Sequence, residues 1–279
     1  STLSMGLSQM ARHHVADVQQ RQQLLDQELA MKSAAQRALY YLLTGTPKQR
    51  SFISGNVELP VDGQWLSWGN VEVSVQDGAG LMGLAIYNQD GLERLFVAGG
   101  VEQAEARVIS ARLGDWIDAD SFVRPGGGEA ATYLKSSAEM LPRDAPLRSL
   151  DGMLELPEIS SELYNGIDGR PGLRDLLVAG SESYFNPASA PELLLGPVLG
   201  ISDTQVAQLI ALKRKQDWDS MRVLVPYAQN IDIAYHPGFE FILRFRTATT
   251  QGRAIYRLSP FKTVPYRLIM WQYPDHARG

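Results

Sequence analysis

A long proline-free stretch near the start of the chain, SMGLSQMARHHVADVQQRQQLLDQELAMKSAAQRALYYLL (residues 4–43), predicts a single amphipathic helix. Its apolar residues recur at spacings of three, four or seven, with a few longer gaps, and include Leu7, Met10, Val18, Leu25, Leu29, Leu39 and Leu42. At about 1.5 Å per residue the helix is roughly 60 Å long. The turn residues at 44–47 end it.

A helix of this length exceeds what one small core can cover, so part of it projects or packs in an assembly. Two interpretations stay open from the residues alone. The first is a coiled-coil or bundle helix, and the second is a projecting anchor stalk.

The chain after this helix has β character at both ends and helical character between them. Residues 55–61, 64–68 and 71–75 read as strands separated by Asp-Gly and Gly-Asn turns. Short helices are expected at 90–98, 101–117, 149–156, 160–167, 172–177, 190–195 and 202–215. Strands return at 240–246, 253–258 and 266–273. We therefore predict one β-sheet interrupted by an inserted α-helical domain, with boundaries at 1–80, 81–225 and 226–279.

The composition excludes several functional classes. The 279 residues are 44% hydrophobic and 20% charged, which is typical of a globular protein. A net charge of -5 argues against nucleic acid, because that affinity needs clustered Lys and Arg. The absence of cysteine excludes disulfides, zinc thiolates and thiol catalysis. No apolar run is long enough to span a bilayer, and the start, without an initiator Met, is expected to be processed or trimmed.

Two glycine-containing motifs are interpreted as structural. The GAGLMG run at 78–83 has dinucleotide-loop spacing but lacks the βαβ context, so it is predicted to be a turn. Residues 194–215 resemble a helix-hairpin-helix around Gly200 and Ile201, and residues 147–167 have a similar shape. Because Asp203 stands where a phosphate would bind, a structural hairpin is favoured. A nucleic-acid-binding module is the alternative.

Hydrolytic catalysis has few candidate residues. The four histidines, His13, His14, His236 and His276, lie in separate or unsuitable positions, and no G-x-S-x-G, H-E-x-x-H or Walker A pattern is present. A carboxylate-based hydrolase that uses Asp115 and Asp118 as an acid and base pair stays a rival hypothesis.

Four acidic residues surround a glycine run in GDWIDADSFVRPGGGEAATY (114–133), which we call the acidic loop. Asp118, Asp120 and Glu129 fall at the first, third and twelfth places of a calcium-binding loop, while Phe122 and Val123 depart from the EF-hand pattern at the fifth and sixth. Two interpretations remain: a calcium site, or helix capping by Asp118 with solvent-facing acids.

With these residues considered, the chain resembles the K-type minor pseudopilin family of bacterial type II secretion (general secretion pathway protein K). The resemblance covers nearly the whole length. It is carried by VQDGAGLMGLAIYN (75–88), GDWIDADSFVRPGGGEAATYL (114–134), APLRSLDGMLELPEISSELY (145–164), YFNPASAPELLLGPVLGISDTQVAQLIALKR (184–214) and YRLIMWQY (266–273).

The resemblance implies an α+β fold in which a pilin-like module, a long N-terminal helix on an antiparallel sheet, carries a large inserted α-helical domain. It also implies that members bind Ca²⁺ in the α-domain. Asp118, Asp120 and Glu129 are therefore the expected ligands, with Asp115 as a further candidate.

The function that this resemblance implies is structural and not enzymatic. The subunit would occupy the tip of a periplasmic pseudopilus and assemble with I-type and J-type minor pseudopilins. Secreted substrate and the outer-membrane secretin are further candidate partners, and nucleic acid is not expected. The expected partner-binding residues are Leu7, Met10, Val18 and Leu25, and the expected location is the periplasmic side of the Gram-negative inner membrane, with an apolar anchoring half and a prepilin leader in front of the present start.

Overall fold

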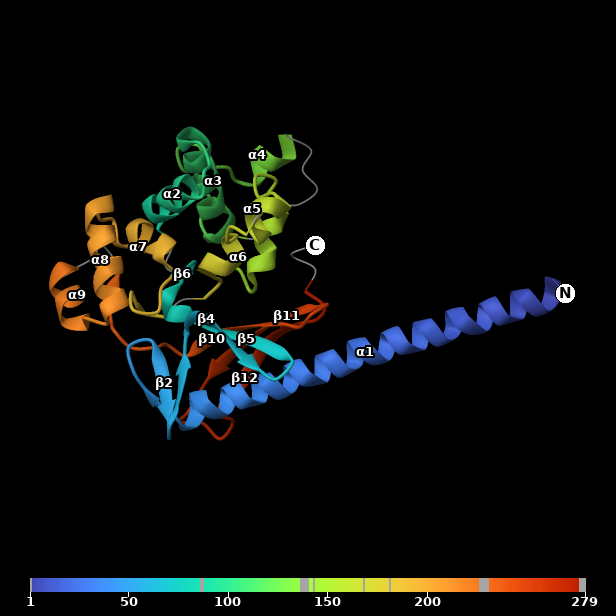
Figure 1. Ribbon diagram of the computed structural model, residues 1–279. Coiled ribbons are helices and arrows are strands. Elements are labelled where there is room, and N and C mark those ends of the chain that lie inside the picture. Colours follow the sequence, from blue (N-terminus) through green and yellow to red (C-terminus); the bar gives the residue numbers. More distant parts are fainter. Residues whose placement is uncertain are drawn as a thin grey trace.

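The computed structural model describes residues 2–85, 88–135, 141–142, 144–167, 169–180, 182–225 and 231–275. Its first element is one continuous helix, α1 (Thr2–Thr44), which confirms the helix expected at 4–43. Figure 1 shows the N-terminal part of α1 extending well beyond the sheet and the rest of the chain. In the described part of the chain, no helix combines the length and the apolar character that crossing a membrane requires.

Two antiparallel sheets follow α1. The smaller contains β1 (Thr46–Pro47), β2 (Ser51–Ser54) and β3 (Val57–Pro60), in that order. The larger contains β4 (Asp62–Trp68), β5 (Val71–Asp77), β10 (Glu240–Arg246), β11 (Gln251–Leu258) and β12 (Tyr266–Gln272), in the order β12-β11-β10-β5-β4. The predicted strands at 240–246 and 266–273 agree with β10 and β12, whereas β1 and β2 were not foreseen in their polar, turn-rich stretch.

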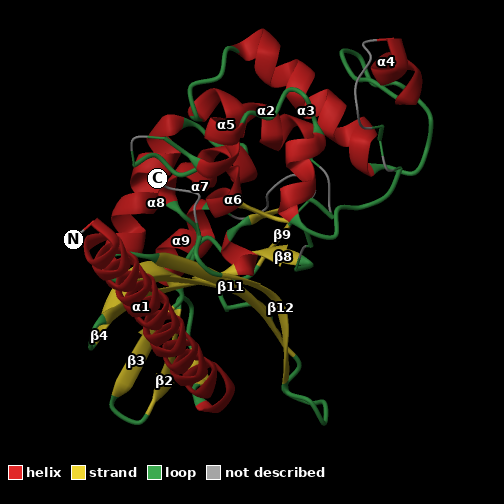
Figure 2. Cartoon of the chain, turned by 90° about the vertical axis from the view of Figure 1, so that its right-hand side faces the viewer, coloured by secondary structure: helices red, strands yellow, loops and turns green. Residues whose placement is uncertain are grey.

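The insertion is visible in the strand pairing. β5 and β10 are neighbours in the sheet, with Phe241 opposite Asp77, although the helical region separates them in sequence. The chain therefore leaves the sheet after β5 and returns to it at β10. The helices between them form a lobe on one face of the five-stranded sheet, while α1 covers the other face (Figure 2).

Alternation along β10 explains how one sheet serves both layers. Phe241, Leu243 and Phe245 join the apolar cluster beneath α1, and Ile242 joins the cluster of the lobe. Successive strand side chains point to opposite faces, so a largely apolar strand can bury both sides. The side of α1 that faces the sheet contributes Met31, Ala35, Ala38, Leu39 and Leu42, all buried.

Hydrogen bonds attach the middle of α1 to residues that follow β12 and to the turn between β10 and β11. The Tyr273 hydroxyl donates to the Leu24 carbonyl at 2.7 Å, and the Thr250 hydroxyl donates to Gln27 Oε1 at 2.7 Å. The helix is therefore attached from about this point onward, and earlier turns extend past the sheet.

The lobe consists of short helices: α2 (Gln89–Ala98), α3 (Gln103–Ile117), α4 (Ala130–Lys135), α5 (Ser161–Asn165), α6 (Leu173–Leu176), α7 (Glu192–Leu199), α8 (Asp203–Lys215) and α9 (Trp218–Leu224). Two turns, η1 (Gly78–Gly80) and η2 (Leu150–Glu155), are 3₁₀ helices, and the pairs β6 (Met82–Gly83) with β7 (Leu177–Val178) and β8 (Tyr184–Phe185) with β9 (Asp232–Ile233) are parallel. The turn expected at 78–83 is confirmed, whereas α4 and α9 were missed because each is too short to show a helical period.

Candidate functional site

Asp115 is the centre of the acidic loop and is fully buried near the end of α3. Its Oδ2 accepts a hydrogen bond from the Gly128 amide at 2.8 Å and another from the Arg124 amide at 3.2 Å. A Cβ atom at Gly127 would lie only 2.0 Å from this oxygen. Gly127 is therefore required so that the backbone can pass closely around a buried carboxylate.

Arg124 brings two of the predicted ligands together. Its Nη1 donates to Asp115 Oδ1 at 2.6 Å and forms a second ion pair with Asp118. Asp118 is the C-cap of α3, where its backbone N–H bonds to the Gly114 carbonyl at 3.1 Å. Asp118 therefore caps α3 through its backbone N–H, whereas its carboxylate pairs with Arg124.

Two carboxylate oxygens of the acidic loop are buried without a hydrogen bond from any residue that the structure describes. Asp118 Oδ1 and Glu129 Oε1 are both buried and have no hydrogen-bond partner among the described residues. Asp120 differs from them, because it is exposed and its Oδ1 accepts from the Phe122 amide at 2.8 Å in a local turn. The loop thus has an inner group, Asp115, Asp118 and Glu129, and an outer residue, Asp120.

The electrostatics of the loop are dominated by negative charge. Burial raises the pKa of Glu129, and the nearby carboxylates of Asp115 and Asp118 raise that pKa further. For Arg124 burial acts to lower the pKa, but the hydrogen bonds to Asp118 and Asp115 hold that pKa above its usual value. The guanidinium is therefore a fixed positive charge at a position that a cation would also favour.

Within the described ranges, no group of three or more His, Cys, Asp or Glu side chains is arranged to hold a metal ion. Arg124 lies between Asp115 and Asp118 instead. The calcium ligand set Asp115, Asp118, Asp120 and Glu129 therefore stays a prediction. Asp115 is also poorly placed to meet a substrate, because it is fully buried and bonded to Arg124 and Gly128.

The partner-binding prediction concerns the outer turns of α1. Val18 is 66% exposed and Leu25 is 49% exposed. The side chains of Leu7 and Met10 lie outside the described residues. Val15 and Leu29 are also more than half exposed and extend the same apolar surface. Leu39 is buried against the sheet, as expected for the C-terminal half of the helix.

The hairpin near Gly200 is built as a structural turn. Gly200 adopts the left-handed conformation after α7, and Ser202 caps α8 in a capping box with Gln205. An exposed ion pair joins Arg214 to Glu192 across the hairpin at 3.2 Å. The Gln205 amide at the N-terminus of α8 is thus already bonded to the Ser202 hydroxyl.

Sequence reasoning missed a buried aspartate at the junction of sheet and lobe. Asp77 ends β5, and its Oδ1 accepts from the amides of Ala79 and Gly238 at 3.0 and 2.9 Å. Its Oδ2 accepts from the Asn186 amide group at 3.0 Å and the Ser189 hydroxyl at 2.6 Å. Asp77 therefore ties the exit of the chain from the sheet to its return, and the DGAG sequence after a strand was the available signal.

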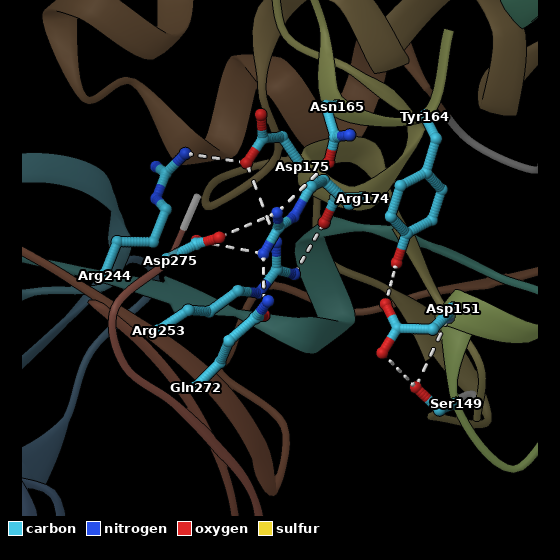
Figure 3. A network of polar contacts seen from close by, with 10 residues as sticks. All are labelled: Ser149, Asp151, Tyr164, Asn165, Arg174, Asp175, Arg244, Arg253, Gln272 and Asp275. Carbon is cyan, nitrogen blue, oxygen red and sulfur yellow. Dashed lines mark hydrogen bonds and ion pairs between the residues drawn. The ribbon is translucent and has the colours of Figure 1, made fainter. Parts of the chain in front are cut away.

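A second missed feature is an arginine network between the sheet and the lobe (Figure 3). Arg174 bonds the Asp275 carboxylate at 3.0 and 3.1 Å, Arg253 donates to the Arg174 carbonyl at 2.6 Å, and Arg244 pairs with Asp175 at 3.2 Å. These residues are scattered over the sequence, so no local motif indicates them.

Part of the chain matches a known protein family. Residues 82–168, which include the whole acidic loop, match the family described as "Type II secretion system (T2SS), protein K". No curated protein matches the chain. The family resemblance inferred from the sequence is confirmed by the match over this segment.

A similar fold is found in a solved structure described as "The Crystal Structure of the GspK-GspI-GspJ complex from enterotoxigenic Escherichia coli Type 2 Secretion System". The matched chain is 17% identical, and the alignment covers 93% of the present chain and 98% of that chain with a TM-score of 0.59. At this identity the similarity establishes the fold. The predicted α+β architecture, with an antiparallel sheet carrying a helical insertion, is therefore confirmed.

Proposed function

We propose that this chain is a K-type minor pseudopilin, a structural subunit at the tip of a type II secretion pseudopilus that supports protein export across the outer membrane. The observation that carries the proposal is the protein K match over 82–168 in a chain whose first helix projects from its own sheet. The proposed place of work is the periplasmic side of a Gram-negative inner membrane. No feature of the site calls for catalysis.

The projecting helix supports assembly with other helices. Val15 and Val18 expose apolar side chains on the turns of α1 that extend past the sheet, and Leu25 and Leu29 expose theirs on the turns that follow. Packing against neighbouring helices would remove this surface from water, and each large apolar side chain contributes about 1.5–3 kcal/mol when fully buried. We propose I-type and J-type minor pseudopilins as the neighbours.

The lobe supports a terminal position in the filament. It covers the face of the sheet opposite α1 and adds bulk at the end of the molecule away from the projecting turns (Figure 1). A further pilin-like subunit stacked on that end would collide with the lobe. A subunit of this shape therefore ends a filament more readily than it extends one.

We also propose that the acidic loop binds Ca²⁺, with Asp118 and Glu129 as the principal ligands. Two orphaned buried carboxylate oxygens and the raised pKa of Glu129 support this, because a hard cation with oxygen ligands would neutralise both. Asp115 would hold the loop in place through its hydrogen bonds to the loop amides, and Asp120 would contribute a ligand from the exposed side. The bound ion would act structurally, by compensating charge.

The test of the assembly is light scattering after size exclusion of the chain mixed with the soluble I-type and J-type pseudopilins of the same genome. An equimolar complex of all three is expected. Val18→Asp combined with Leu25→Asp should weaken it by about a hundredfold, since two apolar contacts are lost and charges are buried. Val223→Asp, at an 80% exposed site on α9, is the matched control. No association in calcium or chelator, or equal weakening by the control, would refute the proposed role.

A further inference from the structure

A cavity of about 340 Å³ lies between the lobe and the sheet, away from the acidic loop and from the exposed face of α1. Its apolar walls come from both layers, for example Leu147 and Val178 of the lobe and Ile242 and Ile255 of the sheet. This volume falls in the range of sites that hold small ligands.

The polar lining of the cavity is rich in arginine. Arg148, Arg174, Arg253, Arg257 and Arg267 line it together with only two acidic residues, Asp151 and Glu240. Such a concentration of positive charge is unusual in a chain with a net charge of -5. Arginine binds carboxylates through paired, parallel hydrogen bonds, so this lining favours an anion.

The arginines at the mouth of the cavity are only loosely paired with acidic side chains. Arg257 forms an ion pair with Glu240 at 3.8 Å, a distance beyond a hydrogen bond, and its side chain remains 42% exposed. Arg148 and Arg267 are exposed, and within the described part of the chain neither forms an ion pair at salt-bridge distance. These side chains are thus free to turn toward a ligand.

The buried side of the cavity contains a guanidinium group without a close carboxylate. In the network of Figure 3, Arg174 pairs with Asp275 and Arg244 pairs with Asp175, whereas Arg253 has no carboxylate oxygen within hydrogen-bond distance among the described residues. Arg253 is only 4% exposed, its nearest carboxylate oxygen is 3.9 Å away on Asp175, and its Nε has no hydrogen-bond partner among the described residues. A buried guanidinium in this situation gains from one further negative charge.

The lining also indicates the kind of anion. The apolar walls favour an organic ligand over inorganic phosphate. The carboxylates of Asp151 and Glu240 in the same lining would repel a doubly charged group more strongly than a singly charged one, which favours a single carboxylate. Tyr164, held by its hydroxyl hydrogen bond to Asp151, adds an aromatic surface on the lobe side.

We propose that this cavity is a binding site for a singly charged carboxylate attached to an apolar group of about the size of a leucine side chain. Arg257 and Arg267 hold the carboxylate at the mouth, with Arg253 supplying positive charge from below, and the apolar group lies between Leu147 and Ile255. Because the cavity is shared by lobe and sheet, the ligand also joins the two layers. The inference is independent of the proposed assembly.

The test is calorimetric titration of the full chain with N-acetyl-leucine, with N-acetyl-leucinamide as the uncharged probe and inorganic phosphate as the anion without an apolar group. Binding of N-acetyl-leucine is expected, and the amide and phosphate should bind at least about tenfold more weakly. A short peptide with a C-terminal leucine separates the two sources of the carboxylate. Tighter binding of the peptide assigns a chain terminus, and equal or weaker binding assigns a free organic acid.

Variants connect this binding to the cavity. Arg257→Gln combined with Arg267→Gln removes surface charges without touching the buried network, and it should weaken N-acetyl-leucine binding by at least about tenfold. Arg214→Gln, an exposed arginine on α8, is the control and should leave binding unchanged. The proposal is overturned if the acid does not bind the folded wild-type chain, if the amide binds equally well, or if the double variant binds like the control.

Discussion

Asp77 at the junction of sheet and lobe and Asp115 in the acidic loop are both fully buried aspartates, yet their surroundings differ. Asp77 accepts four hydrogen bonds from neutral donors drawn from three parts of the chain. Asp115 has one arginine and two loop amides, but beside it lie the unpartnered oxygens of Asp118 and Glu129. The first site is complete within the protein, whereas the second has more negative charge than the protein compensates.

This contrast separates a structural role from a ligand-dependent one. Buried polar groups that are fully bonded stabilise one arrangement of the chain, and removing one partner leaves the others unsatisfied. A carboxylate cluster with orphaned oxygens gains instead from an added cation. Substitutions at the two sites should therefore differ in size, in sign and in their dependence on calcium.

The largest effect is expected from Asp77→Ala. Four buried donors would lose their acceptor, so the free energy of unfolding should fall by about 3–4 kcal/mol, equally in calcium and in chelator. Asp77→Asn should lose less, because the amide keeps one acceptor oxygen. Urea unfolding followed by circular dichroism measures both. Asp219→Ala, at a 96% exposed carboxylate, is the control and should change stability by less than about 0.5 kcal/mol. A loss of stability in Asp77→Ala that depends on calcium would contradict the contrast between Asp77 and Asp115.

The next effect concerns calcium at the acidic loop. At a hundred times its dissociation constant, Ca²⁺ should stabilise the wild-type chain by about 2.7 kcal/mol. Glu129→Gln and Asp118→Asn should remove most of this gain. In chelator, Glu129→Gln should be at least as stable as the wild type because repulsion is relieved, whereas Asp118→Asn also loses its ion pair with Arg124. Thermal unfolding with calcium, with magnesium and with chelator gives the result. A wild-type midpoint that does not respond to calcium would refute the metal site.

Substitution of Arg124 should have an effect of intermediate size, which lowers stability in chelator but raises the affinity for Ca²⁺. Its guanidinium occupies the space between Asp115 and Asp118, so Ca²⁺ has to displace a charge-assisted hydrogen bond. Arg124→Gln should lower stability in chelator and raise calcium affinity by about tenfold. Isothermal titration measures the affinity, with Arg107→Gln on α3 as the control arginine. Weaker calcium binding in Arg124→Gln would show instead that the arginine organises the site.

The smallest effect is a dependence on pH. Since the folded-state pKa of Glu129 is raised, the folded chain holds this proton more tightly than the unfolded chain. Its contribution to stability is then fully present below the ordinary glutamate pKa and is lost as pH rises through the raised value. In chelator, the stability of Glu129→Gln relative to wild type should therefore grow with rising pH across this window. Calcium should abolish this trend, and a difference that shrinks with pH would contradict the assignment.

The sequence was sufficient to predict an element wherever its apolar residues recur at a regular spacing that reflects burial. The apolar repeat of α1 and the alternation of β10 predicted both elements nearly to their ends. The acidic loop was recognisable as a special site because carboxylates cluster around glycines. Short elements such as α4 and β2 carry too few residues to show a period, and tertiary contacts define them.

The residue sequence thus established the long helix, the interrupted sheet and the acidic character of the loop, because these depend on local spacing and residue type. The folded chain added what depends on long-range proximity: the four donors around Asp77, the placement of Arg124 between two acids, and the arginines gathered around the cavity. Such contacts join residues far apart in sequence, and their energies arise from burial and from distances between charges. No periodicity along the chain records those distances, so they become visible only when the lobe and the sheet are packed together.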